Sequence, residues 1–168
     1  MREDIIMQYS AFSAAALLLA FQSSIAMAAN TPTAPSVKDI TVSDTALHTR
    51  YKEAPFAFGT FTLTNHSTTD LLLRGISSPS CNSVTSNRNS QVAIQSPNDM
   101  DDMFQHMAIP RESTLVFPTS EYHLICHGLK VPYQPGNALS FTFHFQNVGD
   151  VTASFTMQPI VEERNVGP

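Results

Sequence analysis

The sequence predicts an all-β protein, a Greek-key β-barrel or sandwich, and three observations support this fold class. Short runs with apolar residues at alternate positions recur along much of the 168-residue chain. Turn-forming residues such as Gly, Pro, Asn and Asp gather between these runs. Long segments with apolar residues at helical spacing are almost absent. Several short strands separated by regularly spaced turns are typical of barrels and sandwiches.

The start of the chain has the pattern of an export signal. Residues 11–21, "AFSAAALLLAF", form an apolar run that is too short to span a bilayer as a helix. Ala26-Met27-Ala28 supplies small residues at a cleavage position, which would leave Ala29 as the new N-terminus. We therefore expect a signal peptide over residues 1–28 and a periplasmic mature protein without a membrane span.

The expected elements follow in order. Residues 29–37, rich in Pro and Thr, are expected to be a flexible linker. The β-domain is expected over residues 38–161, and residues 162–168 lack an apolar pattern and are expected to fray. The expected strands cover residues 37–47, 56–65, 70–77, 113–117, 122–129, 138–146 and 151–160. Residues 56–65 alternate best, with an interruption at Gly59.

One segment, residues 96–110, does not fit a strand. Ser96 is a candidate N-cap and Pro97 stands at the first helical position. Met100, Met103 and Met107 would then share one helical face. Two interpretations stay open. The methionines pack on the barrel as an amphipathic turn, or they serve as metal ligands together with the neighbouring His106.

Composition argues against several classes of function. The net charge of -5 and a pI near 5.6 disfavour a nucleic-acid surface. Neither a G-x-S-x-G nucleophile motif nor a glycine-rich phosphate loop occurs, and the acidic residues are scattered. We therefore expect a protein that is not an enzyme.

The strand expected over residues 122–129 carries two histidines. Alternation places His123 and His127 on one face, with Cys126 on the opposite, inward face. Two imidazoles on one face are either metal ligands or polar residues on a wet surface. Residues four apart on a strand are separated by about 13 Å, so a bulge or a strand end would have to bring them together. Gly128 is a candidate for such an end.

Only two cysteines, Cys81 and Cys126, occur in the chain. An oxidising compartment permits a disulfide between them, which is our expectation; a buried free thiol is the alternative.

Three quoted stretches carry a resemblance to a known family. They are "FGTFTLTNHSTTDLLLRGISSP", "IPRESTLVFPTSEYHLICHGLKVPYQPGN" and "LSFTFHFQNVGDVTASFTM". In this order they resemble the strands and turns of the PCu(A)C-type periplasmic copper chaperones. The resemblance covers about residues 56–160 and implies a cupredoxin-like β-barrel. At the level of the family, it also implies a monomer that carries Cu(I) to a recipient cupro-protein such as a cytochrome oxidase.

The resemblance also implies a ligand set, from which this sequence departs at two positions. The family's ligands are an early His, a loop Met and a His-x-Met pair. His123 matches the His of the pair, but Ile125 stands at the Met position. The early His would fall near Ser86 or Asn87. The candidate ligands are therefore His123, Met100, Met103, His106 and His127. The alternative is a member of the family that has lost copper and acts as a protein-interaction module.

Overall fold

The computed structural model describes residues 34–49, 55–88 and 102–160. These residues lie in the second of two units of the chain, Pro32–Pro168. The expected signal peptide, the tail at 162–168, most of the linker and Met100 lie outside the described residues. Within the described ranges the chain forms β-strands and two short 3₁₀ helices, with no α-helix. The all-β prediction is confirmed.

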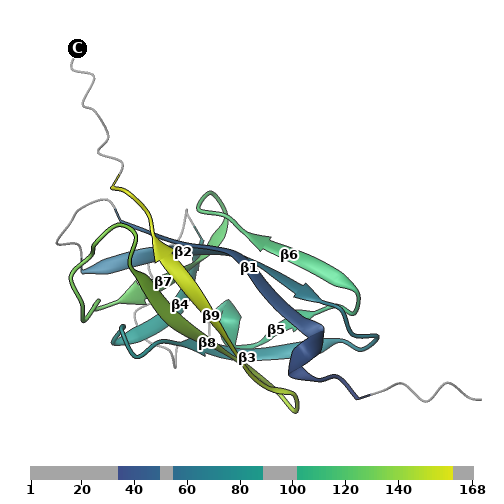
Figure 1. The fold of residues 1–168 in the computed structure, drawn as a ribbon. Helices are drawn as coiled ribbons and strands as arrows, with labels where there is room; N and C mark the ends of the chain where they lie inside the picture. Colours follow the sequence, from purple (N-terminus) through teal and green to yellow (C-terminus); the bar gives the residue numbers. More distant parts are fainter. Residues whose placement is uncertain (1–33, 50–54, 89–101, 161–168) are drawn as a thin grey trace, which may run out of the picture. The chain divides into compact units, whose positions relative to one another are not determined.

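In the described ranges, nine strands pair into one sheet in the order β4-β7-β2-β1-β9-β8-β3-β5, and β6 pairs with β2 beside β7 (Figure 1). The pairing of β1 with β9 is parallel and every other pairing in the described residues is antiparallel. The strands are β1 (Ile40–His48), β2 (Phe56–Asn65), β3 (Leu71–Ser77), β4 (Ser83–Arg88), β5 (Met107–Ile109), β6 (Ser113–Phe117), β7 (Tyr122–His127), β8 (Ala138–Phe145) and β9 (Gly149–Met157).

The sheet curls into a half-barrel around an aromatic core. Strands β3 and β4 stand far apart in the strand order, yet both contact the 3₁₀ helix η2 (Met103–Gln105). This helix inserts Phe104, which is almost fully buried, into the core. Phe61 of β2 stacks on Phe117 of β6 with ring centroids 4.4 Å apart, and it meets Phe143 of β8 edge-on at 5.2 Å. Aromatic contacts between distant strands thus hold the curled sheet together.

Gly59 interrupts the apolar alternation of β2 for a steric reason. A Cβ at this position would lie 2.9 Å from Cδ2 of Leu124 and 3.2 Å from the ring of Phe155. A side chain at this position would therefore force Leu124 of β7 and Phe155 of β9 to shift. The interruption is part of the strand and does not end it.

Two strands, β4 and β5, were not among the expected elements. The sequence of β4, "SVTSNR", has only Val84 as an apolar inward residue, so periodicity gives no strand signal. Its polar residues Thr85, Ser86 and Asn87 are nevertheless buried. Polar residues on an edge strand become buried when another segment of the chain packs on them. The local sequence of the strand does not show which segment does so.

The helical face expected for Met100, Met103 and Met107 does not continue to Met107, and this part of the prediction is wrong. The helix η2 ends after one turn, with His106 as its C-cap at φ -141° and ψ 25°. Met107 then starts β5 and pairs with Leu73 of β3. Strand pairing at the sheet edge prevails over the helical spacing of the methionines.

Candidate metal site on the outer face of β4 and β7

The candidate site begins with the register of β7 against its two neighbours. Asn87 of β4 lies opposite His123, and Thr85 lies opposite Ile125. On the other side, Phe58 of β2 lies opposite Ile125. Residues directly opposite each other in antiparallel strands share a face. These residues therefore form one continuous outer face, while Leu124 and Cys126 point into the core.

His123 is held as a neutral imidazole with one nitrogen available. Only 3% of the residue is exposed, and its ring lies edge-on to Phe58 with centroids 5.3 Å apart. Nδ1 lies 3.1 Å from the Glu121 carbonyl oxygen, which can only accept, so Nδ1 carries the proton and Nε2 the lone pair. Burial lowers the pKa of His123 below 6.5, and the hydrogen bond to the Glu121 carbonyl opposes this in part. A backbone carbonyl that fixes the tautomer is the usual support of a metal-binding histidine.

Asn87 is the direct cross-strand partner of His123 and a buried polar residue. It is 9% exposed, and its Oδ1 accepts no hydrogen bond in the described part of the chain. Opposite Cβ atoms in an antiparallel pair are about 4.5–5.5 Å apart, so the amide and the imidazole are neighbours. The position at which the resemblance puts an early His is thus filled by an amide beside His123.

Ile125 supplies no donor atom to this face. It is 2% exposed and lies between Phe58 and Thr85 in the row of residues next to His123. The position that carries a Met in the resemblance is therefore a packed hydrophobic contact. A soft sulfur ligand for this face has to come from another segment.

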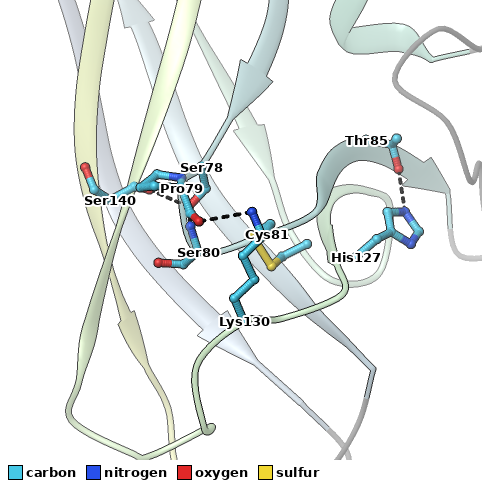
Figure 2. Close-up of a disulfide and its surroundings, with 9 residues drawn as sticks. Ser78, Pro79, Ser80, Cys81, Thr85, His127, Lys130 and Ser140 are labelled. Carbon is cyan, nitrogen blue, oxygen red and sulfur yellow. Dashed lines mark hydrogen bonds between the residues drawn. A yellow bond between two sulfur atoms is a disulfide. The ribbon is translucent and has the colours of Figure 1, made fainter.

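The second histidine of β7, His127, is engaged elsewhere. Its Nε2 lies 2.9 Å from Oγ1 of Thr85. Figure 2 marks this hydrogen bond with a dashed line. Pairing with β4 runs in unbroken register from Tyr122 to His127, so no bulge shortens the distance from His123. The strand ends at His127, and Gly128 follows with φ 58°, as expected for a strand end. The structure does not gather the two histidines into one ligand pair.

Met103 approaches β4 from the inward side. Asp102 is a buried residue with 2% of its surface exposed. Its Oδ1 accepts hydrogen bonds from N and Oγ of Ser86, at 2.9 and 2.7 Å, and from N of Phe104, at 3.1 Å. The Met103 N–H donates to Ser86 Oγ at 2.9 Å, and its side chain packs against the core. Ser86 and Asn87 are successive residues of a strand, so their side chains point to opposite faces. Asn87 shares the face of His123. Met103, which hydrogen-bonds to Ser86, therefore begins on the face opposite His123. His106 is exposed at the end of η2.

The two cysteines form the predicted disulfide (Figure 2). Cys81 and Cys126 are 2% and 0% exposed, and their Cα atoms are 5.4 Å apart. The bridge joins the segment before β4 to β7 on the inward side, behind the strand that bears His123. The Lys130 N–H donates to the Ser80 carbonyl at 2.9 Å and ties the same segment to the chain after β7.

Ser77, His144 and Asp150 contact one another in series on β3, β8 and β9, in another part of the sheet than β4 and β7. Nε2 of His144 is 2.8 Å from Oγ of Ser77, and Nδ1 is 2.9 Å from Oδ1 of Asp150. The side chains of His144 and Asp150 are 40% and 58% exposed. Nucleophilic catalysis also needs a site that excludes water and an oxyanion hole. We interpret these contacts as cross-strand pairing of β3, β8 and β9.

Among the described residues, no group of three or more His, Cys, Asp or Glu side chains could hold a metal ion. In the same part of the chain, no helix is both long and apolar enough to cross a bilayer. A site on β4 and β7 would therefore need donors of other types, such as an amide oxygen or a thioether.

The fold is the cupredoxin-like fold of PCuAC domains of known structure. The copper-bound PCuAC domain from PmoF2 is similar with a TM-score of 0.58 and 16% identity, over 71% of this chain and 92% of that one. The Cu(I) form of DR1885 from Deinococcus radiodurans gives a TM-score of 0.53 and 19% identity, over 82% and 87%. The chain belongs to the LpqE-like family of putative lipoproteins, whose sequence profile matches residues 36–157. No curated protein matches the chain.

The sequence predicts the disulfide that the structure contains and offers His123 as a candidate ligand, but it gives Asn87 no role of its own. The only signal was the resemblance, which placed an early ligand near Ser86 or Asn87. Which of the two faces His123 is a matter of strand register, and the structure resolves it as Asn87.

Proposed function

We propose that this is an exported copper-binding protein that holds Cu(I) through Nε2 of His123 on the outer face of β7. The observation that supports this most is the buried, neutral His123, anchored at Nδ1 by the Glu121 carbonyl. An imidazole in this state presents a lone pair without having to lose a proton first. The fold shared with PCuAC domains, two of which are described as copper-bound, supports the same proposal.

The second ligand that we propose is the thioether of Met100. Thioether sulfur and imidazole both suit the soft Cu(I) ion. Met100 precedes Asp102 by two residues, which span at most about 7 Å. Asp102 is tied to Ser86 by two hydrogen bonds, and Ser86 adjoins Asn87. Met100 is therefore close in sequence to a residue that contacts β4, whereas the contacts of Met103 are with the core.

His106 and His127 are weaker candidates for the same ion. His106 is exposed, and His127 is engaged with Thr85. We include both as ligand candidates in the test below, and we expect smaller effects from their substitution than from that of His123.

We further propose that the protein delivers copper to a recipient cupro-protein, such as a cytochrome oxidase. An ion that is held by only a few protein ligands would transfer readily to a recipient that offers more of them. The proposed export depends on the signal peptide at residues 1–28.

The test of the proposed function is an anaerobic Cu(I) competition titration of the purified protein. We expect one Cu(I) per chain, with binding lost in His123→Ala and weakened in Met100→Leu. Met103→Leu is the matched thioether control, and it should bind as the wild type does. His106→Ala and His127→Ala should bind with affinity close to that of the wild type. Wild-type binding by His123→Ala would contradict the proposal.

A second function is favoured by the residues at the two altered positions. Asn87 and Ile125 are both buried, and neither offers nitrogen or sulfur to copper. A member of the family that has lost copper and acts as an exported interaction module would keep such a packed face. Failure of the wild-type protein to bind Cu(I) in the titration would favour this function over the first.

A further inference from the structure

Strand β6 forms an edge of the sheet that lacks the usual protection. Within the described ranges it pairs with β2 alone, and its register from Ser113 to Phe117 contains no bulge. Its five residues include no charged side chain and no proline. Natural edge strands are usually blunted by lysine, proline, a bulge or a covering segment, because an open edge presents unpaired N–H and C=O groups to other chains. The outer edge of β6 is therefore able to accept another strand.

The edges of the sheet at β4 and β5 differ from β6 in this respect. The Ser86 N–H of β4 donates to Oδ1 of Asp102 at 2.9 Å. At the end of β5, the side-chain amide of Asn65 donates to the carbonyl oxygens of Ile109 and Pro110, at 3.3 and 3.0 Å. Side chains thus cap backbone groups at both of these edges. No side chain in the described ranges caps the backbone of β6 in this way.

The side chains of β6 are also suited to pairing with another strand. Val116 is 65% exposed, the largest exposed fraction among the exposed large apolar residues of the described ranges. Thr114 is exposed on the same face, and Leu115 packs against the core but is only partly buried. β-Branched side chains that lie opposite each other stabilise antiparallel pairs. A further strand beside β6 would cover Val116 and complete the burial of Leu115.

We infer that β6 pairs with β6 of a second copy of this chain, antiparallel, about a twofold axis at Leu115. This register pairs all five residues and places Thr114 of each copy opposite Val116 of the other. A shift by one residue would set inward side chains opposite outward ones. A strand that is complementary to itself in this way suits a symmetric dimer, in which both copies use the same surface.

The charges that flank β6 favour the antiparallel arrangement. Arg111 precedes the strand and Glu121 follows it, both are exposed, and neither forms an ion pair within the described ranges. In the proposed register Arg111 lies opposite Thr119 of the second copy, two residues from its Glu121. Glu112 lies opposite Pro118, so no like charges are directly opposed. Opposite charges therefore approach each other at both ends of the paired strands.

The inferred dimer is weak and independent of copper. Two paired strands of five residues bury less area than a standard interface of about 1,600 Å², so the dimer should dissociate on dilution. Strand β6 carries none of the candidate copper ligands, so the inference goes beyond the proposed function and does not rest on it. It replaces the monomer that the family resemblance implies.

The experiment is sedimentation velocity of the purified protein over a wide range of concentration, without added metal. We expect the average mass to rise from that of a monomer toward that of a dimer. Val116→Lys places a charge on each side of the twofold axis and should weaken association by about tenfold or more. Val37→Lys is the matched control, because Val37 is a 41% exposed valine on the other 3₁₀ helix, η1 (Val37–Asp39). This variant should associate as the wild type does.

A charge reversal keeps the inference testable if Val116→Lys does not fold. Arg111→Glu, at an exposed position, should weaken the dimer, and combining it with Glu121→Arg should restore the association. A wild-type protein that stays monomeric at every concentration would overturn the inference. A dimer that both Val116→Lys and Arg111→Glu leave intact would overturn it as well, because the contact would then lie on another surface.

Discussion

At the scale of single residues, burial controls the charge of two histidines. Burial lowers the pKa values of His48 and His123 below 6.5. His48 lies opposite Phe58 in the pairing of β1 with β2, and the Phe58 ring also contacts His123. The unfolded chain therefore binds more protons than the folded one once the pH falls below about 6.5.

The free energy of unfolding should accordingly decrease as the pH is lowered below about 6.5. The contribution of the neutral histidines is complete above about pH 6.5 and is lost as the pH falls toward their folded-state pKa values. Urea unfolding at pH 7.5 and pH 5.5 should therefore give the lower free energy of unfolding at pH 5.5. His123→Phe should reduce the difference, whereas His106→Gln at an exposed position should keep it. An unchanged difference in His123→Phe would mean that His123 is not the responsible group.

The sequence could offer His123 as a candidate ligand, but it could not show which residue of the neighbouring strand faces it. Alternation along residues 122–127 is enough to separate His123 from Cys126 and to point the cysteine inward. The opposition of Asn87 and His123 depends on the register between two strands separated by more than thirty residues of chain, and no local pattern encodes it. The tautomer of His123 depends in the same way on the fold of the backbone at Glu121.

At the scale of elements, Asp102 attaches η2 to β4. Three donors converge on its Oδ1, from Ser86 and from the first turn of η2. Asp102→Ala removes the acceptor and leaves buried donors unpaired, so it should lower the free energy of unfolding by about 2–4 kcal/mol. Asp70→Ala is the control, because that carboxylate accepts one exposed bond from the Arg111 N–H. Chemical denaturation measures both, and equal losses would contradict the role of Asp102 as an anchor.

The disulfide attaches β4 to β7 from the inward side. Reduction, or Cys81→Ala with Cys126→Ala, releases a constraint over a separation of 45 residues. The chain-entropy relation gives about 4 kcal/mol for a loop of this length. The free energy of unfolding should fall by a similar amount, and differential scanning calorimetry with and without reductant measures it. No change on reduction would show that the bridge does not form in the protein.

Elements with a regular apolar pattern were predictable, and those built from polar residues were not. Strands β2, β7 and β8 have alternating or apolar sequences, and each lies within about two residues of its expected range. Strand β4 has three buried polar residues in succession, of which Thr85 hydrogen-bonds to His127 of β7 and Ser86 to Asp102, the N-cap of η2. The helix expected near Met103 shortens to one turn, because β5 pairs with β3 immediately after it.

At the scale of the whole domain, the strand order brings the copper-related positions to one side of the sheet. Because β4 and β7 are neighbours at one end of the order, Asn87 and His123 share the outer face. The aromatic core and the disulfide lie behind this face. The fold class followed from the sequence, because many short alternating runs have few other solutions. The register of β4 against β7 was needed to see which residues stand where the resemblance implies ligands.

The measurement that tests the central claim most directly is a long-range ¹H–¹⁵N nuclear magnetic resonance spectrum of the histidine side chains, recorded during anaerobic addition of Cu(I). We predict that free His123 is protonated at Nδ1 and that one equivalent of Cu(I) shifts its Nε2 resonance. Backbone shifts should be concentrated on β4 and β7 around Asn87 and His123, while the resonances of His144 stay in place. Unchanged His123 resonances, or shifts confined to other histidines, would contradict a copper site on this face.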